Sequence, residues 1–282
     1  MYPLWKDRNN EGGGMNNTKI EWVKNPDGTQ GYTWNPITGC LNGCDYCYAR
    51  KVANTRLKER YLANKNWVTG IDISSYPNND PFYPRFWEDR MSCQFSYYGK
   101  KAQGIFVCSM SDLFGIGIPE QWIRKVLALI EVYPRHRFYL LTKQPRNLAK
   151  FSPFPDNCRV GVSATSDRHF YDAVCYLRDI EAEVKYISIE PMLTEITTAN
   201  PVHLKGCGIN WIIIGSQTKP TVHPKIKWVK DVVEAADLAG IPVFLKDNLK
   251  PLIFTTVNGK DIVESHNLWA CKYFKLRQEM PR

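Results

Sequence analysis

The sequence predicts an α/β protein in which parallel strands form a partial TIM-like barrel of six or seven βα units. From residue 105 to residue 245, short apolar segments rich in β-branched residues alternate with segments of helical periodicity. The strand candidates are continuous apolar runs, as expected where helices cover a face of a parallel sheet. A further strand candidate before Cys40 brings the number of units to six or seven. An open doubly wound sheet is the alternative. Alternating strands and helices are expected in both architectures, so this pattern does not distinguish them.

Each element follows from a local signal. The segment 105–109 is apolar and bounded by turn residues, and Pro119 suits the first position of a helix that extends to about Val132. Gly240 suits the residue after a helix end. The expected strands are about 32–36, then 105–109, 137–142, 159–163, 184–189, 211–214 and 243–245. The expected helices are 119–132, a short one from Pro145, 167–178 and 225–239, with a loop from 190 to 208.

Three segments lie outside this repeat. Residues 1–17 are predicted to be a flexible leader to a barrel over 18–251. Residues 64–104 are rich in proline, asparagine and aromatic residues, and an insertion of this length is usually functional or packs independently. We interpret it as an aromatic cap over the barrel, with a base-stacking platform as the alternative. Residues 252–282 are predicted to be a hairpin and tail, because Asn258-Gly259 separates two strand candidates, 252–257 and 260–263.

Composition excludes several classes of protein. With 282 residues, 44% hydrophobic and 23% charged, the chain is a folded globular protein and not a disordered one. It contains no apolar run near the ~18 residues that a membrane span needs. Residues 1–14 have no apolar segment of the signal-peptide type, so we expect a cytoplasmic protein without a membrane partner. The net charge of +9 favours anionic partners such as nucleic acid or phosphorylated ligands.

The nine cysteines are distributed unevenly. An odd number and no export signal argue against a disulfide framework. Six are scattered and are interpreted as small buried hydrophobic residues. The other three, Cys40, Cys44 and Cys47, lie within eight residues of one another. This group needs a different explanation.

The spacing C-x3-C-x2-C is typical of a loop that wraps one iron–sulfur cluster. Gly39 and Gly43 supply the backbone angles that such a tight loop requires. Three cysteines leave the fourth iron of a four-iron, four-sulfur cluster without a protein ligand, so a small molecule can chelate it. A structural zinc site is the alternative, but no second cysteine pair is present. The sequence therefore predicts a 4Fe-4S cluster.

An aromatic residue, Tyr46, directly before the third cysteine completes a motif that resembles the radical S-adenosylmethionine (SAM) enzymes. Over nearly the whole chain the sequence is similar to a phage- and prokaryote-associated family of uncharacterised radical-SAM-like proteins, distantly similar to spore photoproduct lyase. The matching stretches are TKIEW (18–22), TWNPITGC (33–40), CDYCYA (44–49), SMSDLF (109–114), LTK (141–143), GVS (161–163), SIEP (188–191) and VFLKDN (243–248).

The resemblance implies a reaction and its partners. The amine and carboxylate of SAM chelate the open iron, and one-electron reduction releases a 5′-deoxyadenosyl radical that abstracts hydrogen from a substrate. The cofactors implied are a 4Fe-4S cluster and SAM, and the electron donor is a protein such as flavodoxin or ferredoxin. Charge, aromatic content and the distant lyase resemblance favour nucleic acid or a nucleotide as substrate. A non-enzymatic nucleic-acid-binding protein with a structural Fe-S or zinc site is the alternative.

In TIM-like barrels the site lies at the carboxyl ends of the strands, so polar residues there are the candidates. Those expected to contact the cofactors are Ser109, Ser111, Asp112, Lys143, Ser163 and Glu190, together with Tyr46 of the cysteine motif. Asp112 stands in for the Gly-Gly-Glu element that accepts the SAM amine in much of the superfamily, because this chain has Ser-Met-Ser-Asp instead. Lys246 and Asp247 are expected to face substrate, and Cys108 to return hydrogen to a product radical. The alternatives are ion pairs at the barrel mouth and, for Cys108, packing in the core.

A basic helix is predicted over 48–63, after the cysteine loop. Its buried stripe is Ala53, Leu57 and Tyr61. Five basic residues, namely Arg50, Lys51, Arg56, Lys58 and Arg60, accompany a single acid, Glu59. We interpret them as a solvated basic face; a surface that follows the phosphates of a nucleic acid is the alternative.

Overall fold

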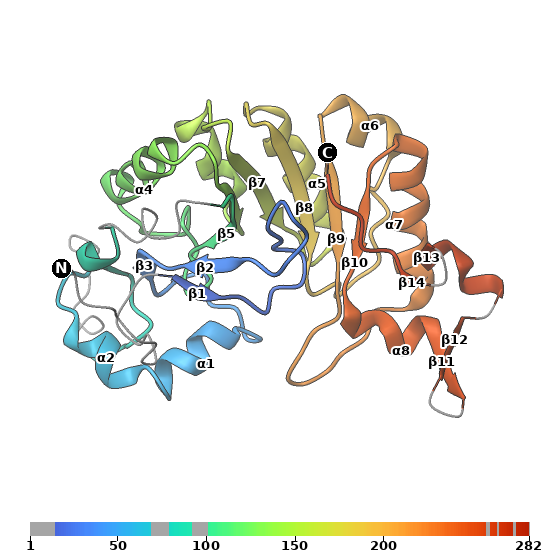
Figure 1. Ribbon diagram of the computed structural model, residues 1–282, viewed down its shortest axis with the longest axis horizontal. Coiled ribbons are helices and arrows are strands. Elements are labelled where there is room, and N and C mark those ends of the chain that lie inside the picture. Colours follow the sequence, from blue (N-terminus) through green and yellow to red (C-terminus); the bar gives the residue numbers. More distant parts are fainter. Residues whose placement is uncertain are drawn as a thin grey trace.

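An eight-stranded, mostly parallel sheet forms the centre of the computed structural model, which describes residues 15–68, 79–91, 101–257, 260–263, 265–272 and 275–281 (Figure 1). The strand order is β1-β2-β5-β6-β7-β8-β9-β10, and only β1 and β2 pair antiparallel. The strands are β1 (Met15–Asn17), β2 (Tyr32–Trp34), β5 (Gly104–Val107), β6 (Arg137–Thr142), β7 (Cys158–Ser163), β8 (Val184–Ile189), β9 (Trp211–Ile214) and β10 (Val243–Leu245). The predicted α/β class is confirmed, and the sheet does not close into a complete barrel.

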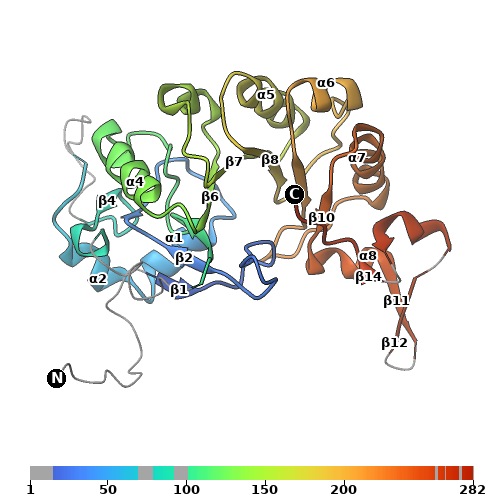
Figure 2. The same cartoon turned by 45° about the horizontal axis from the view of Figure 1, so that its top comes forward.

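Helices follow the parallel strands and lie along the outer side of the curved sheet (Figure 2). They are α4 (Glu120–Val132), the 3₁₀ segment η2 (Pro145–Phe151), α5 (Asp167–Arg178), α6 (Pro201–Gly206) and α7 (Ile226–Ala239). Gly240 ends α7 in the left-handed conformation, with φ of 72°. The expectation of a loop throughout 190–208 was wrong. Asn200 caps a short helix there by accepting hydrogen bonds from the N–H groups of Val202 and His203.

The inner face of the sheet is filled by the segment 18–31, which connects β1 to β2. Trp22 lies at the centre of an aromatic cluster and makes edge-on contacts with Phe106, Tyr139, Tyr186 and Trp211. Gly161 belongs to the same packing, because a Cβ there would lie 2.3 Å from the ring of Tyr186. The concave side of the sheet is therefore a packed core below any site at the strand ends.

Chain that the sequence assigns to a leader and a tail pairs with the sheet at each of its two ends. Residues 15–17, expected as the end of the leader, form β1 and pair with β2. At the far edge the tail pairs with β10: the Leu245 N–H donates to the Arg277 carbonyl at 2.8 Å, and the Glu279 N–H donates to the Val243 carbonyl at 3.0 Å. Pairing with the tail covers the β10 side of the sheet, whereas β1 is itself the edge strand at the other side.

The expected helix over 48–63 is interrupted and forms α1 (Tyr48–Asn54) and α2 (Lys58–Ala63). The side chains of Asn54 and Thr55 donate to the carbonyls of Arg50 and Lys51, both at 2.8 Å. Such side-chain bonds compete with the regular helix, and the Leu57 N–H bonds back to the Val52 carbonyl instead of to residue 53.

The described part of the insertion packs against the segment that leads into the cysteine loop. Its strand β4 (Arg85–Phe86) pairs with β3 (Ile37–Thr38), which leads into the cysteine loop, and the 3₁₀ turn η1 (Glu88–Arg90) follows. The aromatic side chains of residues 82, 83, 86 and 87 are buried. Arg85 is also buried, and it donates to the carbonyls of residues 64, 80, 81 and 83. Tyr76, Phe95, Tyr97 and Tyr98 lie outside the described residues.

The predicted C-terminal hairpin is confirmed. Strands β11 (Phe254–Val257) and β12 (Lys260–Val263) pair antiparallel. The first strand begins two residues later than expected, because α8 (Lys250–Ile253) and the 3₁₀ turn η3 (Asp247–Leu249) precede it. The remaining elements are η4 (Ser265–Ala270), β13 (Cys271–Lys272) and β14 (Lys275–Leu276). Within the described ranges, no helix is both long and apolar enough to cross a bilayer.

Candidate functional site

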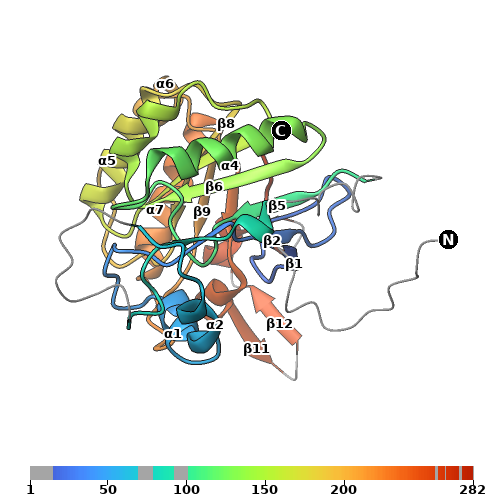
Figure 3. The same ribbon diagram turned by 90° about the vertical axis from the view of Figure 1, so that its left-hand side faces the viewer.

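The cysteine loop lies at the carboxyl ends of the parallel strands, where α1, α2 and the loop after β9 also lie (Figures 1 and 3). The loop is attached to its surroundings by backbone hydrogen bonds: the Gly39 N–H donates to the Met110 carbonyl, and the Cys40 N–H to the Phe82 carbonyl, both at 2.9 Å. Gly39 has φ of 87°, and a Cβ there would lie 2.4 Å from the Tyr83 carbonyl oxygen. Only glycine fits at the entry to the loop.

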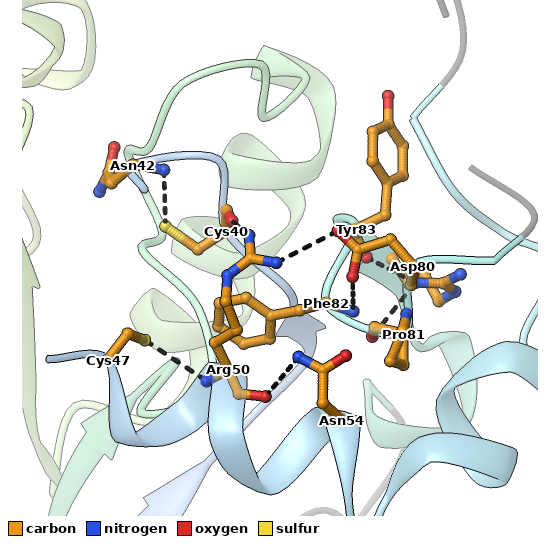
Figure 4. Close-up of polar contacts among 10 residues, drawn as sticks. Cys40, Asn42, Cys47, Arg50, Asn54, Asp80, Pro81, Phe82 and Tyr83 are labelled. Carbon is orange, nitrogen blue, oxygen red and sulfur yellow. Dashed lines mark hydrogen bonds and ion pairs between the residues drawn. The ribbon is translucent and has the colours of Figure 1, made fainter. Parts of the chain in front are cut away.

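Two of the three sulfur atoms accept backbone hydrogen bonds (Figure 4). The Asn42 N–H donates to Cys40 Sγ and the Arg50 N–H to Cys47 Sγ, each at 3.4 Å. Cys47 is the N-cap of α1, and its side chain accepts the hydrogen bond of the Arg50 N–H there. Burial raises the pKa of the Cys40 thiol to about 12, and the nearby carboxylate of Asp112 adds to the shift. A bound metal would have to displace this proton.

Arg50 holds the cysteine loop against the insertion. Its guanidinium lies over the ring of Phe82 at 5.0 Å, pairs with Asp80 at 3.3 Å and donates to the Cys40 carbonyl at 3.3 Å (Figure 4). One side chain from α1 therefore joins the loop to the cap. The predicted solvated face consequently does not include Arg50.

A cavity of about 1240 Å³ opens at this edge of the sheet and brings the predicted residues together. All three cysteines line it, and so do the predicted residues from five of the strand ends. The predicted residues that line it are Cys40, Cys44, Tyr46, Cys47, Cys108, Ser109, Ser111, Asp112, Lys143, Ser163, Glu190 and Lys246. A large concave site with convergent polar groups is the usual form of a ligand site.

Asp247 is the exception. It is exposed, and its carboxylate contacts Lys250 Nζ at 3.0 Å and Gln278 Nε2 at 3.1 Å, away from the cavity. The chain turns into η3 directly after Lys246, so the two residues point in different directions. Their adjacency in the sequence does not place both at the site.

Asp112 is enclosed by hydrogen bonds. Its Oδ2 accepts from Asn42 Nδ2 at 2.9 Å and from the Lys143 N–H at 2.8 Å, and its Oδ1 accepts from the Phe114 N–H at 3.1 Å. The side chain of Gln144 extends this network to Asn42 at 3.0 Å. Burial raises the pKa of Asp112, and the hydrogen bonds oppose the shift. The structure makes Asp112 the link between the cysteine loop and the end of β6, rather than a free acceptor for an amine.

The two serine hydroxyls also have partners in the chain. Ser109 Oγ donates to Asn35 Oδ1 at 3.2 Å, and Ser111 Oγ donates to the Gly39 carbonyl. Each hydroxyl oxygen keeps lone pairs that can accept from a ligand. These contacts hold the turn after β5 against the start of the cysteine loop.

Lys143 is a cation without an acidic partner among the described side chains. Its Nζ donates to Ser163 Oγ at 2.6 Å and lies 5.6 Å from the centre of the Tyr46 ring. An ammonium group held in a cavity by a hydroxyl and an aromatic face can bind a carboxylate or a phosphate. Lys143 and Ser163, predicted separately, therefore form one subsite.

Glu190 and Lys246 form an ion pair at 2.6 Å across the cavity. The other carboxylate oxygen of Glu190 accepts from Ser188 Oγ at 2.8 Å and from Trp22 Nε1 at 2.9 Å. Burial disfavours the charge on Lys246, but the attraction of Glu190 exceeds this effect, and the pKa of Lys246 is raised. The indole of Trp22 holds the carboxylate of this pair in place through its hydrogen bond to Glu190.

The donor set fits a cluster with soft ligands. Three sulfur atoms on one loop line one cavity, and basic side chains surround them, whereas no histidine lines that cavity. Among the described residues, no group of three or more His, Cys, Asp or Glu side chains is already arranged to hold a metal ion. Binding of a cluster therefore requires the three thiol groups to draw together.

Comparison with known protein families identifies the chain. A family profile described as a protein of unknown function, DUF5131, matches residues 17–251. The chain belongs to the DUF5131 family. Searches of curated proteins and of solved structures gave no match. The match ends before the C-terminal hairpin, and it includes every residue that lines the cavity except Asn16.

Cys108 of this DUF5131 protein combines two unusual properties. It is buried at the cavity wall, and its φ of 61° is rare for a residue other than glycine. Burial raises the pKa of its thiol to about 12, so the sulfur keeps its hydrogen at neutral pH. Cys108 also packs in the main hydrophobic core, which is the role expected if it takes no part in the chemistry.

Three residues that line the cavity were not predicted from the sequence as site residues. Asn42 stands between the first two cysteines, and Ser188 is the penultimate residue of β8, so a search of those segments for polar side chains could have found both. Trp22 lies 168 residues from Glu190 and no local pattern connects them.

Proposed function

We propose that this protein is a radical SAM enzyme whose substrate is a nucleic acid or a nucleotide. The observation that carries the proposal is the single cavity that contains the C-x3-C-x2-C cysteines together with nine further residues expected at such a site. The open, mostly parallel sheet is compatible with a partial TIM-like barrel, which we propose as its fold. Flavodoxin or ferredoxin is the proposed electron donor.

In this proposal Cys40, Cys44 and Cys47 hold a 4Fe-4S cluster. With SAM bound, the cluster supplies a 5′-deoxyadenosyl radical by one-electron reductive cleavage of the sulfonium. Lys143 and Ser163 bind the SAM carboxylate, because their subsite has an unpaired positive charge. The aromatic cluster around Trp22 closes the floor of the cavity and excludes water from below.

Glu190 and Lys246 orient hydroxyl groups of the bound ligands. The carboxylate of Glu190 is held by three donors and can still accept from a ribose hydroxyl, while the ammonium of Lys246 has further N–H groups to donate. Asp112 acts through other residues: it fixes Asn42 and the backbone of Lys143.

Cys108 is proposed to return a hydrogen atom to a product radical. We expect Cys108→Ala to change the distribution of products without stopping SAM cleavage, because the thiol lies in the cavity wall and outside the cysteine motif. Chromatography of products and of 5′-deoxyadenosine, with the wild-type protein in parallel, measures both quantities. An unchanged product pattern would leave Cys108 with a packing role only.

Anaerobic reconstitution with iron and sulfide tests the function. After reduction and addition of SAM, we expect a low-temperature EPR signal that SAM perturbs, together with formation of 5′-deoxyadenosine. Both should fall to background in Cys44→Ala and persist in Cys175→Ala, a control on α5 outside the cavity. A cluster or zinc site indifferent to SAM would contradict the proposal and favour a nucleic-acid-binding protein with a structural metal.

A further inference from the structure

Helices α1 and α2 form one wall of the cavity, and this wall is basic. Arg56 and Arg60 line the cavity, and Lys51 and Lys58 are exposed on the same two helices. The interruption after Asn54 matters here, because it places Arg56 in the turn between the helices, where the side chain is exposed at the cavity.

The lining of the cavity has an excess of positive charge. Its basic side chains are Lys19, Arg56, Arg60, Arg90, Lys143 and Lys246, and its acidic ones are Glu59, Asp112 and Glu190. Two of the three carboxylates are already engaged, Glu190 by Lys246 and Asp112 by its hydrogen bonds. No ion pair between described residues includes Lys19 or Arg56. A ligand that enters this cavity therefore meets uncompensated positive charge, which favours an anion.

The same wall presents an aromatic side chain. Tyr48, in the first turn of α1, lines the cavity and is 61% exposed, so its ring is available to a ligand. Arginine side chains that contact phosphates, beside an exposed aromatic ring that stacks on a base, are the usual elements of single-strand recognition. A base within a duplex cannot reach a concave site without leaving the stack.

We propose that the α1–α2 wall binds the phosphates of a single-stranded nucleic acid, with phosphate groups on Arg56 and Arg60 and a base against Tyr48. This inference deepens the proposed function. It rests on that function only where it identifies the bound nucleic acid as the substrate of the enzyme. Binding itself requires neither the cluster nor SAM, so the two proposals can fail separately.

Fluorescence anisotropy on the full chain tests whether the α1–α2 wall binds a single-stranded nucleic acid. The probe is a labelled single-stranded oligonucleotide of about ten nucleotides, compared with a duplex of the same sequence and with a mononucleotide as competitor. The test variant is Arg56→Glu with Arg60→Glu. The control is Arg135→Glu with Lys205→Glu, which makes the same change in net charge at exposed positions outside the cavity.

We expect the test variant to weaken binding of the single strand by at least about 30-fold and the control by less than about threefold. The logarithm of the association constant falls linearly with the logarithm of the salt concentration. The magnitude of this slope should be smaller by about 1.4 in the test variant, because two phosphate contacts are lost. Tyr48→Ala should weaken binding about tenfold without changing that slope. Competition by the mononucleotide at equal affinity would support the phosphate site and identify a free nucleotide as its source.

Three results would overturn the inference. One is equal loss in both double variants, which would reflect net charge alone. Another is duplex binding as tight as single-strand binding. The third is no oligonucleotide binding together with loss of flavodoxin binding in the test variant, which would make the wall a docking surface for an acidic protein. Circular dichroism and thermal midpoints on each variant show that the fold is retained.

Discussion

Replacing Asp112 by alanine should lower the free energy of unfolding by about 3 kcal/mol, since each buried donor left unsatisfied costs about 1–3 kcal/mol. The substitution leaves Asn42 Nδ2 and the N–H groups of Lys143 and Phe114 without their acceptor. Removal of a buried charge offsets part of that cost, because burial disfavours the ionised form of Asp112. Urea unfolding, followed by circular dichroism, measures the difference.

The matched control for this substitution is Asp156→Ala, at an exposed position between η2 and β7. It should change stability by less than about 0.5 kcal/mol. Asp112→Asn should fall between the two, because one carbonyl oxygen still accepts. If Asp112→Ala lowers the free energy of unfolding no more than the control does, the hydrogen bonds of Asp112 do not fix the cysteine loop to β6.

Trp22→Ala should destabilise the protein more than Asp112→Ala does. We expect it to lower the free energy of unfolding by about 4 kcal/mol, in the range found for buried aromatic residues replaced by alanine. The indole is 1% exposed, contacts four aromatic rings and donates to Glu190. Its removal leaves a cavity that the rigid sheet cannot fill. The measurement is again the urea midpoint and slope by circular dichroism.

Trp228→Ala provides the comparison, because it also removes one tryptophan but from a half-buried position on α7. Trp228→Ala should lower the free energy of unfolding by at most half as much as Trp22→Ala does. Trp22→Phe separates packing from hydrogen bonding, since it keeps a ring in the cluster and removes the donor to Glu190. Similar losses in Trp22→Ala and Trp228→Ala would contradict a central role for the aromatic cluster.

The strands were predictable because each is a continuous apolar run that needs no distant partner to be recognised. Strands β6, β8, β9 and β10 have the expected bounds. The errors arose where side chains compete with the backbone. Thr55 interrupts the basic helix by bonding to Lys51, and Asn200 begins a short helix within an apparent loop.

The candidate site was predictable to the extent that it is local. The cysteine motif, with Tyr46, is contiguous, and the rule that sites lie at strand ends placed seven further residues at the same cavity, namely Ser109, Ser111, Asp112, Lys143, Ser163, Glu190 and Lys246. Asp247, one residue beyond Lys246, does not line that cavity, and its carboxylate contacts Gln278 instead. The rule also could not find Trp22, whose partners come from four strands and depend on the complete fold.

The gap between the two edges of the sheet is bridged by side chains from the segment 18–31. The Glu21 carboxylate accepts from the Asp247 N–H at 2.7 Å, and the Trp22 indole donates to Glu190 at 2.9 Å. In a closed barrel a complete ladder of backbone hydrogen bonds would fix that distance. Here the hydrogen bond of Glu21, worth about 1 kcal/mol, and the packing and hydrogen bond of Trp22 take its place. The mouth of the cavity is therefore closed on this side by side chains and not by paired backbone.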